Sequence, residues 1–238
     1  MITMKDLLLP LMLAAALPAG AGAREMSASE FMDNFKALLE QTPEPPQVSE
    51  ARLIELEEGD PETYVFIRGA KAHPPAPVNL GGDGRLTLAR PDRGERVTAV
   101  YRRRDGSYDR EEIKKISWIM RSSGTGEQTE PALRLLEILD AVEDRYGGGG
   151  LTLLSGYRSP GYNRRVPGSA RYSMHMLGWA ADIRVPGQGP ARVAGFARKM
   201  RAGGVGYYPD AAFVHLDAGR ARYWKTCRSS PAPRRRPS

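Results

Sequence analysis

The chain has 238 residues, of which 41% are hydrophobic, and its formal net charge is +7. This length suits one large domain or two small ones, and the hydrophobic share is sufficient for a packed core. Five basic residues and no acidic residue lie within residues 224–238, so the rest of the chain is close to neutral. This distribution excludes a nucleic-acid-binding surface spread over a fold.

Residues 1–23 have the pattern of a secretory signal peptide. Lys5 supplies a positive charge, an apolar run extends from Leu7 to Leu17, and an Ala-Gly-Ala sequence at 21–23 is typical of a cleavage site. The apolar run is too short for a transmembrane helix. We therefore predict an exported protein, and the alternative is an uncleaved anchor or a buried helix.

Residues 24–84 are predicted to form an N-terminal extension. A short helix begins near Ser29, and residues 64–67 resemble a strand. A stretch rich in proline and glycine at 73–84 has the character of a linker, so we place a domain boundary at residue 84. His73 lies beside these prolines and is interpreted as an exposed bystander rather than a ligand.

The region from 85 to 224 contains both strands and helices without regular βαβ alternation. We therefore predict an α+β domain over 85–224, with a small, mostly antiparallel sheet flanked by helices. The expected strands are residues 85–89, 96–101, 151–154, 180–185, 205–208 and 213–217, and the expected helices are residues 107–121, 190–202 and one beginning near residue 129.

Residues 225–238 form a basic, proline-rich tail that we predict to be disordered. The favoured interpretation is a solvated tail, and the alternative is weak contact with an anionic membrane or wall polymer.

Two histidines and a carboxylate have the composition of a catalytic metal site. Asp182 follows His175 by seven residues, so the segment must fold back for both to bind one ion, and Gly178 is the natural place for a turn. His215 lies in a strand-like alternation, with Asp217 two positions later and hence on the same face. Two imidazoles and one carboxylate leave a fourth zinc position for water. The alternative for either histidine is an ordinary buried, hydrogen-bonded side chain.

Four ordered motifs resemble those of the LAS-type zinc peptidases, a group that includes lysostaphin, the D-Ala-D-Ala carboxypeptidases and hedgehog signalling domains. The similarity is nearest to the murein endopeptidase branch and covers about residues 85–224. The motifs are Ser155-Gly156-Tyr157-Arg158-Ser159, Ser173-x-His175-x-x-Gly178-x-Ala180-x-Asp182, Gly204-Val205-Gly206-Tyr207-Tyr208-Pro209 and Phe213-Val214-His215-x-Asp217.

This resemblance implies roles for individual residues. His175, Asp182 and His215 match the zinc ligands, Arg158 matches an arginine on the substrate side, and Ser173 matches a residue that hydrogen-bonds substrate. The implied reaction is attack of zinc-activated water on a stem-peptide cross-link of peptidoglycan. The resemblance also places an exported protein of this kind in the periplasm, and we expect a monomer.

The chain departs from the family pattern at the general base. Many relatives have a glutamate three residues before the last zinc histidine, where this chain has Ala212, and others have a histidine where it has Phe213. Asp210 and Asp217 are the remaining candidates among nearby acids, and Asp217 is also a candidate for holding a ligand in place. The alternative function is a zinc-containing peptidoglycan-binding module that has lost catalysis. For Arg158, the alternative to substrate binding is a structural ion pair. The peptide bond that is cut does not follow from these residues.

Overall fold

The computed structural model describes residues 60–147 and 149–227. These residues belong to one compact unit. The predicted signal peptide, the helix near Ser29 and the tail from residue 228 onward lie outside the described residues. Within the described ranges, no helix is both long enough and apolar enough to cross a membrane.

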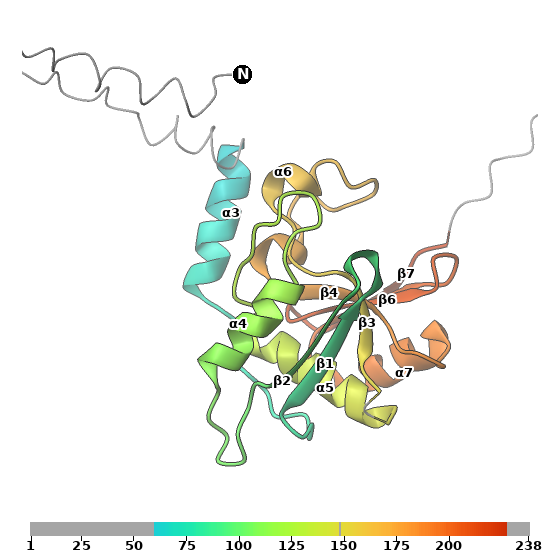
Figure 1. Ribbon diagram of the computed structural model, residues 1–238. Coiled ribbons are helices and arrows are strands. Elements are labelled where there is room, and N and C mark those ends of the chain that lie inside the picture. The colour runs from blue at the N-terminus through green and yellow to red at the C-terminus, as the bar shows by residue number, and fades with distance from the viewer. Residues whose placement is uncertain (1–59, 148, 228–238) are drawn as a thin grey trace, which may run out of the picture. The chain divides into compact units, whose positions relative to one another are not determined.

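The described part of the chain contains a sheet of seven strands in the order β2-β1-β3-β4-β6-β5-β7 (Figure 1). The α+β class is confirmed, but the sheet is larger than the small one predicted and it is mixed, with four antiparallel and two parallel pairings. β3 runs parallel to β1, and β7 runs parallel to β5. Two helices separate β2 from β3, which gives the chain room to return in the direction of β1. The strands are β1 (Arg85–Arg90), β2 (Glu95–Val100), β3 (Leu151–Ser155), β4 (Ala180–Arg184), β5 (Gly204–Tyr208), β6 (Phe213–Asp217) and β7 (Arg222–Lys225).

Several helices begin after a residue whose side chain accepts a hydrogen bond from a free backbone N–H group of the first turn. The side chain of Asp109 accepts hydrogen bonds from the N–H groups of Glu111 and Glu112, so α4 begins at Arg110 and not at residue 107 as predicted. The second predicted helix begins at Leu133 rather than near 129. The helical segments are α3 (Pro61–Ala72), η2 (Pro91–Arg93), α4 (Arg110–Ile119), α5 (Leu133–Arg145), α6 (Pro160–Asn163), η3 (Met174–Leu177) and α7 (Pro190–Met200).

The strand predicted at residues 64–67 is wrong, because these residues belong to α3. Asp60 caps this helix by accepting a hydrogen bond from the Glu62 N–H, and Pro61 occupies its first turn. Its buried positions, Thr63 and Ile67, are four residues apart and therefore share one helical face. Both signals favour a helix over a strand.

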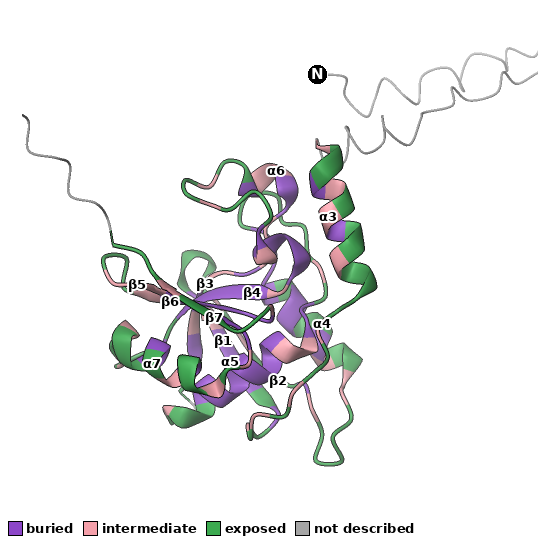
Figure 2. Cartoon of the chain, turned by 180° about the vertical axis from the view of Figure 1, so that it is seen from behind, coloured by how far each residue is buried: buried purple, intermediate pink, exposed green. Residues whose placement is uncertain are grey.

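The two faces of the central strands have different surroundings. Leu153, Ile183 and Leu216 belong to the main hydrophobic core. Helices α5 and α7 supply core residues of their own and pack against this side of the sheet (Figure 1). Side chains alternate between the two faces along a strand, so the residues next to these three in each strand point to the opposite face of the sheet. β4 is buried along nearly its whole length (Figure 2), so the polar groups on its second face are also removed from bulk water.

Candidate metal centre and substrate cleft

A single row of residues crosses the sheet at the site. The strand registers pair Ser155 with Asp182, Asp182 with His215, His215 with Gly206 and Gly206 with Trp224. Directly paired residues have neighbouring side chains on the same face. A Cβ on Gly206 would lie 2.6 Å from two atoms of the Trp224 indole, so the missing side chain lets the indole lie against the sheet. The indole ring is then 5.3 Å from the His215 ring.

His175 reaches the same place from η3. The Ser173 hydroxyl accepts a hydrogen bond from the backbone N–H of His175 at 3.3 Å and caps this short helix. Gly178 ends η3 with φ of +73°, and a Cβ there would lie 2.6 Å from Thr129 Cγ2. The predicted fold-back at Gly178 is therefore confirmed, and it is the turn that brings His175 above the start of β4.

Three ligand-type atoms converge on one point. His215 Nδ1 lies 2.8 Å from Asp182 Oδ1 and 3.1 Å from His175 Nε2, and His175 Nε2 lies 3.3 Å from the same Asp182 oxygen. All three residues are buried, with exposed fractions of 2%, 7% and 9% for His175, Asp182 and His215. This set of two imidazoles and one carboxylate could hold a metal ion.

The second nitrogen of each imidazole has an oxygen partner that fixes the ring. His175 Nδ1 lies 2.7 Å from the carbonyl oxygen of Gly156, which can only accept, so Nδ1 carries the proton and the Nε2 lone pair faces the centre. His215 Nε2 lies 3.2 Å from Asp217 Oδ2, which leaves Nδ1 facing the centre. Partners of this kind orient metal-binding histidines in many proteins, so the donor set fits a zinc ion.

Asp217 is fully buried behind His215 and does not line the cleft. Besides His215, its carboxylate accepts hydrogen bonds from the N–H of Gly219 at 2.8 Å and from the Arg222 guanidinium at 2.7 and 3.0 Å. Burial raises the pKa of Asp217, but the hydrogen bond from His215 and the nearby positive charges outweigh burial and keep the pKa below its usual value. The position suits a residue that orients His215.

The ionisable groups of the centre are strongly coupled. Burial raises the pKa of Asp182, but attraction to His175 and hydrogen bonds from both histidines outweigh burial and hold that pKa far below its ordinary value. Burial lowers the pKa of His175. Burial also lowers the pKa of His215, but Asp182 and Asp217 on either side outweigh that effect and raise the pKa to about 9.

Arg158 lies at the edge of the centre. Its Nη2 donates to Asp182 Oδ2 at 2.5 Å and its Nε donates to Ser155 Oγ at 2.8 Å. Asp182 thus turns one oxygen toward the histidines and the other toward Arg158. The ion pair that was the structural alternative for Arg158 is present, and the same guanidinium also lines the cleft.

A cleft of about 670 Å³ opens over the three ligand-type residues. Arg158 and Ser173 line it, as do residues 166–170, Tyr172, Tyr208 and Trp224. Among the described residues that line this cleft, Asp182 is the one carboxylate. Asp210 is exposed in the turn between β5 and β6 and is not part of the lining, so neither predicted base faces the cleft directly.

Several contributors to the site were not predicted. The Gly156 carbonyl is a backbone group and carries no residue-type signal. Arg222 reaches Asp217 because β7 pairs in parallel with β5, and this pairing has no local signature. Tyr172 also lines the cleft, and no pattern in the sequence singled it out. Gly206 is a signal for the packing of Trp224, because a side chain at position 206 would collide with the indole.

The mixed sheet and the buried pair of histidines with an aspartate define a metallopeptidase-like site. Comparison of the sequence with family models gives a match over residues 82–224 to Peptidase_M15_2, described as peptidoglycan L,D-endopeptidase MepK. The chain therefore belongs to this peptidase family, and the predicted relationship to the LAS-type zinc peptidases is confirmed.

Curated relatives agree with the family match. The probable peptidoglycan L,D-endopeptidase MepK of Haemophilus influenzae is 31% identical over 146 residues, which cover 59% of this chain and 78% of the relative. The peptidoglycan L,D-endopeptidase MepK of Escherichia coli K12 is 35% identical over 148 residues, which cover 58% of this chain and 79% of the relative. No solved structure gives a significant match.

Proposed function

We propose that this protein is a zinc-dependent endopeptidase that hydrolyses L,D peptide bonds in peptidoglycan cross-links. The observation that carries the proposal is the convergence of His175 Nε2, His215 Nδ1 and Asp182 Oδ1, with both remaining imidazole nitrogens already held by oxygen acceptors. The substrate and the type of bond are those for which the two relatives are named.

His175, Asp182 and His215 would hold the ion in this proposal. A zinc ion in such a site polarises a carbonyl group and lowers the pKa of a water molecule to about 7. The protein itself supplies fixed ligand orientations, because Gly156 and Asp217 hold the two rings. The role we propose for Asp217 is therefore positioning of His215.

Arg158 is proposed to bind the substrate. Its contacts with Ser155 and Asp182 hold the guanidinium at the cleft edge before substrate arrives. A planar, preoriented guanidinium suits either a stem-peptide carboxylate or the oxyanion that develops on the scissile carbonyl. Ser173, which lines the cleft and also caps η3, is proposed to contact the bound peptide.

Export is part of the proposal, because peptidoglycan lies outside the cytoplasmic membrane. The signal-peptide pattern of residues 1–23 agrees with this location. The near-neutral body of the protein also agrees with a substrate that is not a nucleic acid. We propose that the protein acts in the periplasm as a monomer.

The deciding experiment is mass spectrometry of muropeptides after the mature protein is incubated with purified sacculi. We expect cross-linked dimers to be converted to monomers, and we expect a chelator or His175→Ala to abolish the conversion. His73→Ala is the matched control, because His73 is exposed and lies outside the centre. Binding to sacculi without any released fragment would refute the proposal and favour a binding module. Cleavage by His175→Ala at the parental rate would place the active site elsewhere.

A further inference from the structure

We infer that helix α3, which precedes the region matched by the family model, fixes one wall of the substrate cleft and makes Tyr172 a substrate-positioning residue. The wall consists of residues 164–173, and Tyr172 lies where this segment meets the helix. The expected effect on substrate affinity rests on the proposed function, while the contact between α3 and the wall does not.

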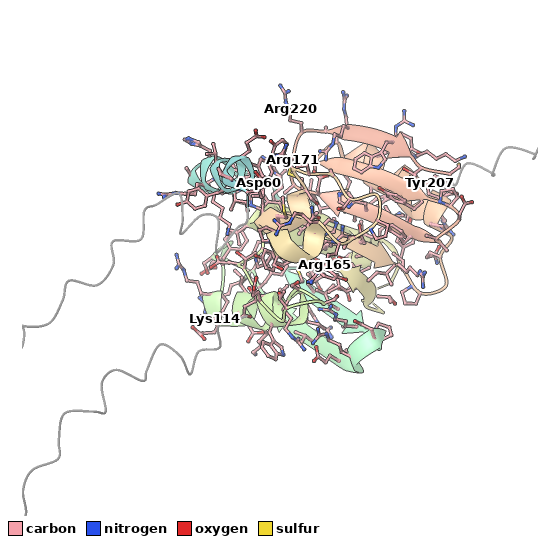
Figure 3. The ribbon with its side chains drawn as sticks, turned by 90° about the horizontal axis from the view of Figure 1, so that it is seen from above. Asp60, Lys114, Arg165, Arg171, Tyr207 and Arg220 are labelled. Atoms are coloured by element: carbon pink, nitrogen blue, oxygen red, sulfur yellow. The ribbon has the colours of Figure 1, made fainter. Side chains whose placement is uncertain are left out.

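Polar contacts join the start of α3 to the end of the wall. Arg171 Nη2 lies 2.9 Å from Asp60 Oδ2 and 3.1 Å from a Glu62 carboxylate oxygen. The Tyr172 hydroxyl donates to Glu62 Oε2 at 2.7 Å. Asp60 and Arg171 lie side by side between the helix and the wall (Figure 3). Asp60 also caps α3, so the residue that starts the helix holds the wall as well.

Apolar contacts extend this attachment toward the metal centre. The Phe66 ring packs against the Tyr172 ring with their centroids 5.2 Å apart. The next residue, Ile67, forms a buried cluster with Met176 and Leu177 of η3, the segment that carries His175. α3 therefore contacts both the cleft wall and the back of a ligand-bearing segment.

The wall is held at its other end by the main body of the domain. Asn163 Nδ2 donates to the Ala170 carbonyl oxygen at 2.9 Å, and Ser169 Oγ donates to the Asn163 carbonyl oxygen at 2.6 Å. Residues 166–170, which line the cleft, are thus anchored by Asn163 on one side. Tyr172 faces the cleft and α3 at the same time and is the anchor on the other side.

Removing this attachment is expected to loosen the wall and to leave the domain folded. Arg171 and Glu62 are more than half exposed, and exposed ion pairs contribute little to stability. The main core lies elsewhere, and neither Phe66 nor Tyr172 belongs to it. The consequence should appear in substrate binding, because a wall that occupies several positions binds substrate less tightly.

The test combines Phe66→Ala with Tyr172→Phe, which removes the ring contact and the hydroxyl contact. Hydrogen exchange measured by mass spectrometry should become at least about 10-fold faster in residues 164–173, with β4 and β6 unchanged. On a soluble cross-linked muropeptide dimer, KM should rise about 5- to 10-fold while kcat stays within about 2-fold. Zinc content and Tm should remain close to those of the parent.

Val65→Ala is the matched control, since Val65 lies on the same helix and is 68% exposed. It should change neither exchange nor KM, and Phe66→Leu should restore part of the lost affinity. Unchanged exchange in residues 164–173 of the double variant would overturn the inference. So would a joint loss of kcat, zinc and Tm, because that pattern indicates a purely structural role. If the parent cleaves nothing, the proposed function fails, and exchange still decides whether α3 holds the wall.

Discussion

Asp217→Asn tests how much the centre depends on the group behind His215. The amide keeps the shape of the carboxylate and one acceptor oxygen, but it loses the charge that faces His215 Nε2 and Arg222. A hydrogen bond to a charged group contributes about 1.5–3 kcal/mol to stability. Loss of an outer partner of a metal ligand lowers metal affinity about 10- to 100-fold, which corresponds to about 1.4–2.7 kcal/mol. The free energy of one charged hydrogen bond is thus of the same size as the usual loss of metal binding. We therefore expect the zinc affinity of Asp217→Asn to fall about 10- to 100-fold.

The assay is a zinc titration of the metal-free protein against a competing chelator, with Tm measured for each form. Asp140→Asn is the control, because Asp140 is also fully buried and is hydrogen-bonded to Tyr101 away from the centre. It should change stability and leave zinc affinity alone. A parental zinc affinity in Asp217→Asn would show that His215 is oriented by its strand and not by Asp217.

Three further predictions concern stability. Removing the metal with a chelator should lower Tm, because a ligand present at about 1,000 times its Kd stabilises the folded state by about 4 kcal/mol; an unchanged Tm would contradict a metal held by the folded chain. Burial, partly offset by the hydrogen bond from Tyr101, raises the pKa of Asp140 from 3.8 to about 6. The folded protein then binds more protons than the unfolded chain between these values, so stability should fall as the pH rises through this window, by about 1–2 kcal/mol. Urea unfolding at pH 4, 5 and 6 measures this slope, which Asp140→Asn should flatten. Gly178→Ala should lower the free energy of unfolding by about 1–2 kcal/mol for the left-handed backbone alone. The contact of the new Cβ with Thr129 should lower it further and weaken zinc binding. Parental stability and zinc binding would show that the turn tolerates a side chain.

The sequence was most informative where chemistry and turn geometry coincide. Two histidines and an aspartate form a rare set, and Gly178 marks the turn that lets His175 and Asp182 meet. The strand at β6 alternates apolar and polar residues, so the shared face of His215 and Asp217 could be assigned in advance. These features depend on neighbours within a few residues, and a single sequence contains that information.

The remaining features depend on contacts between distant segments. The parallel pairing of β1 with β3 joins Leu88 to Leu151, and no local pattern encodes it. Residues 64–67 resemble a strand when read alone, but they belong to α3, whose buried face contacts the distant segment η3. The spacing predicts that Asp217 shares a face with His215, but the burial of Asp217 behind His215 depends on Arg222 and on two backbone amides. The roles of the individual site residues stay predictions.

The pairing of β4 with β6 links activity to completion of the fold. Asp182 and His215 are direct partners across these strands. A slip of one residue would turn one of them into the core and the other toward the cleft, since successive side chains alternate between faces. A chain with a shifted strand therefore has no three-ligand site at all, not a weakened one. Under the proposed function, hydrolysis of the cell wall therefore has to wait until β4 and β6 have paired in the correct register.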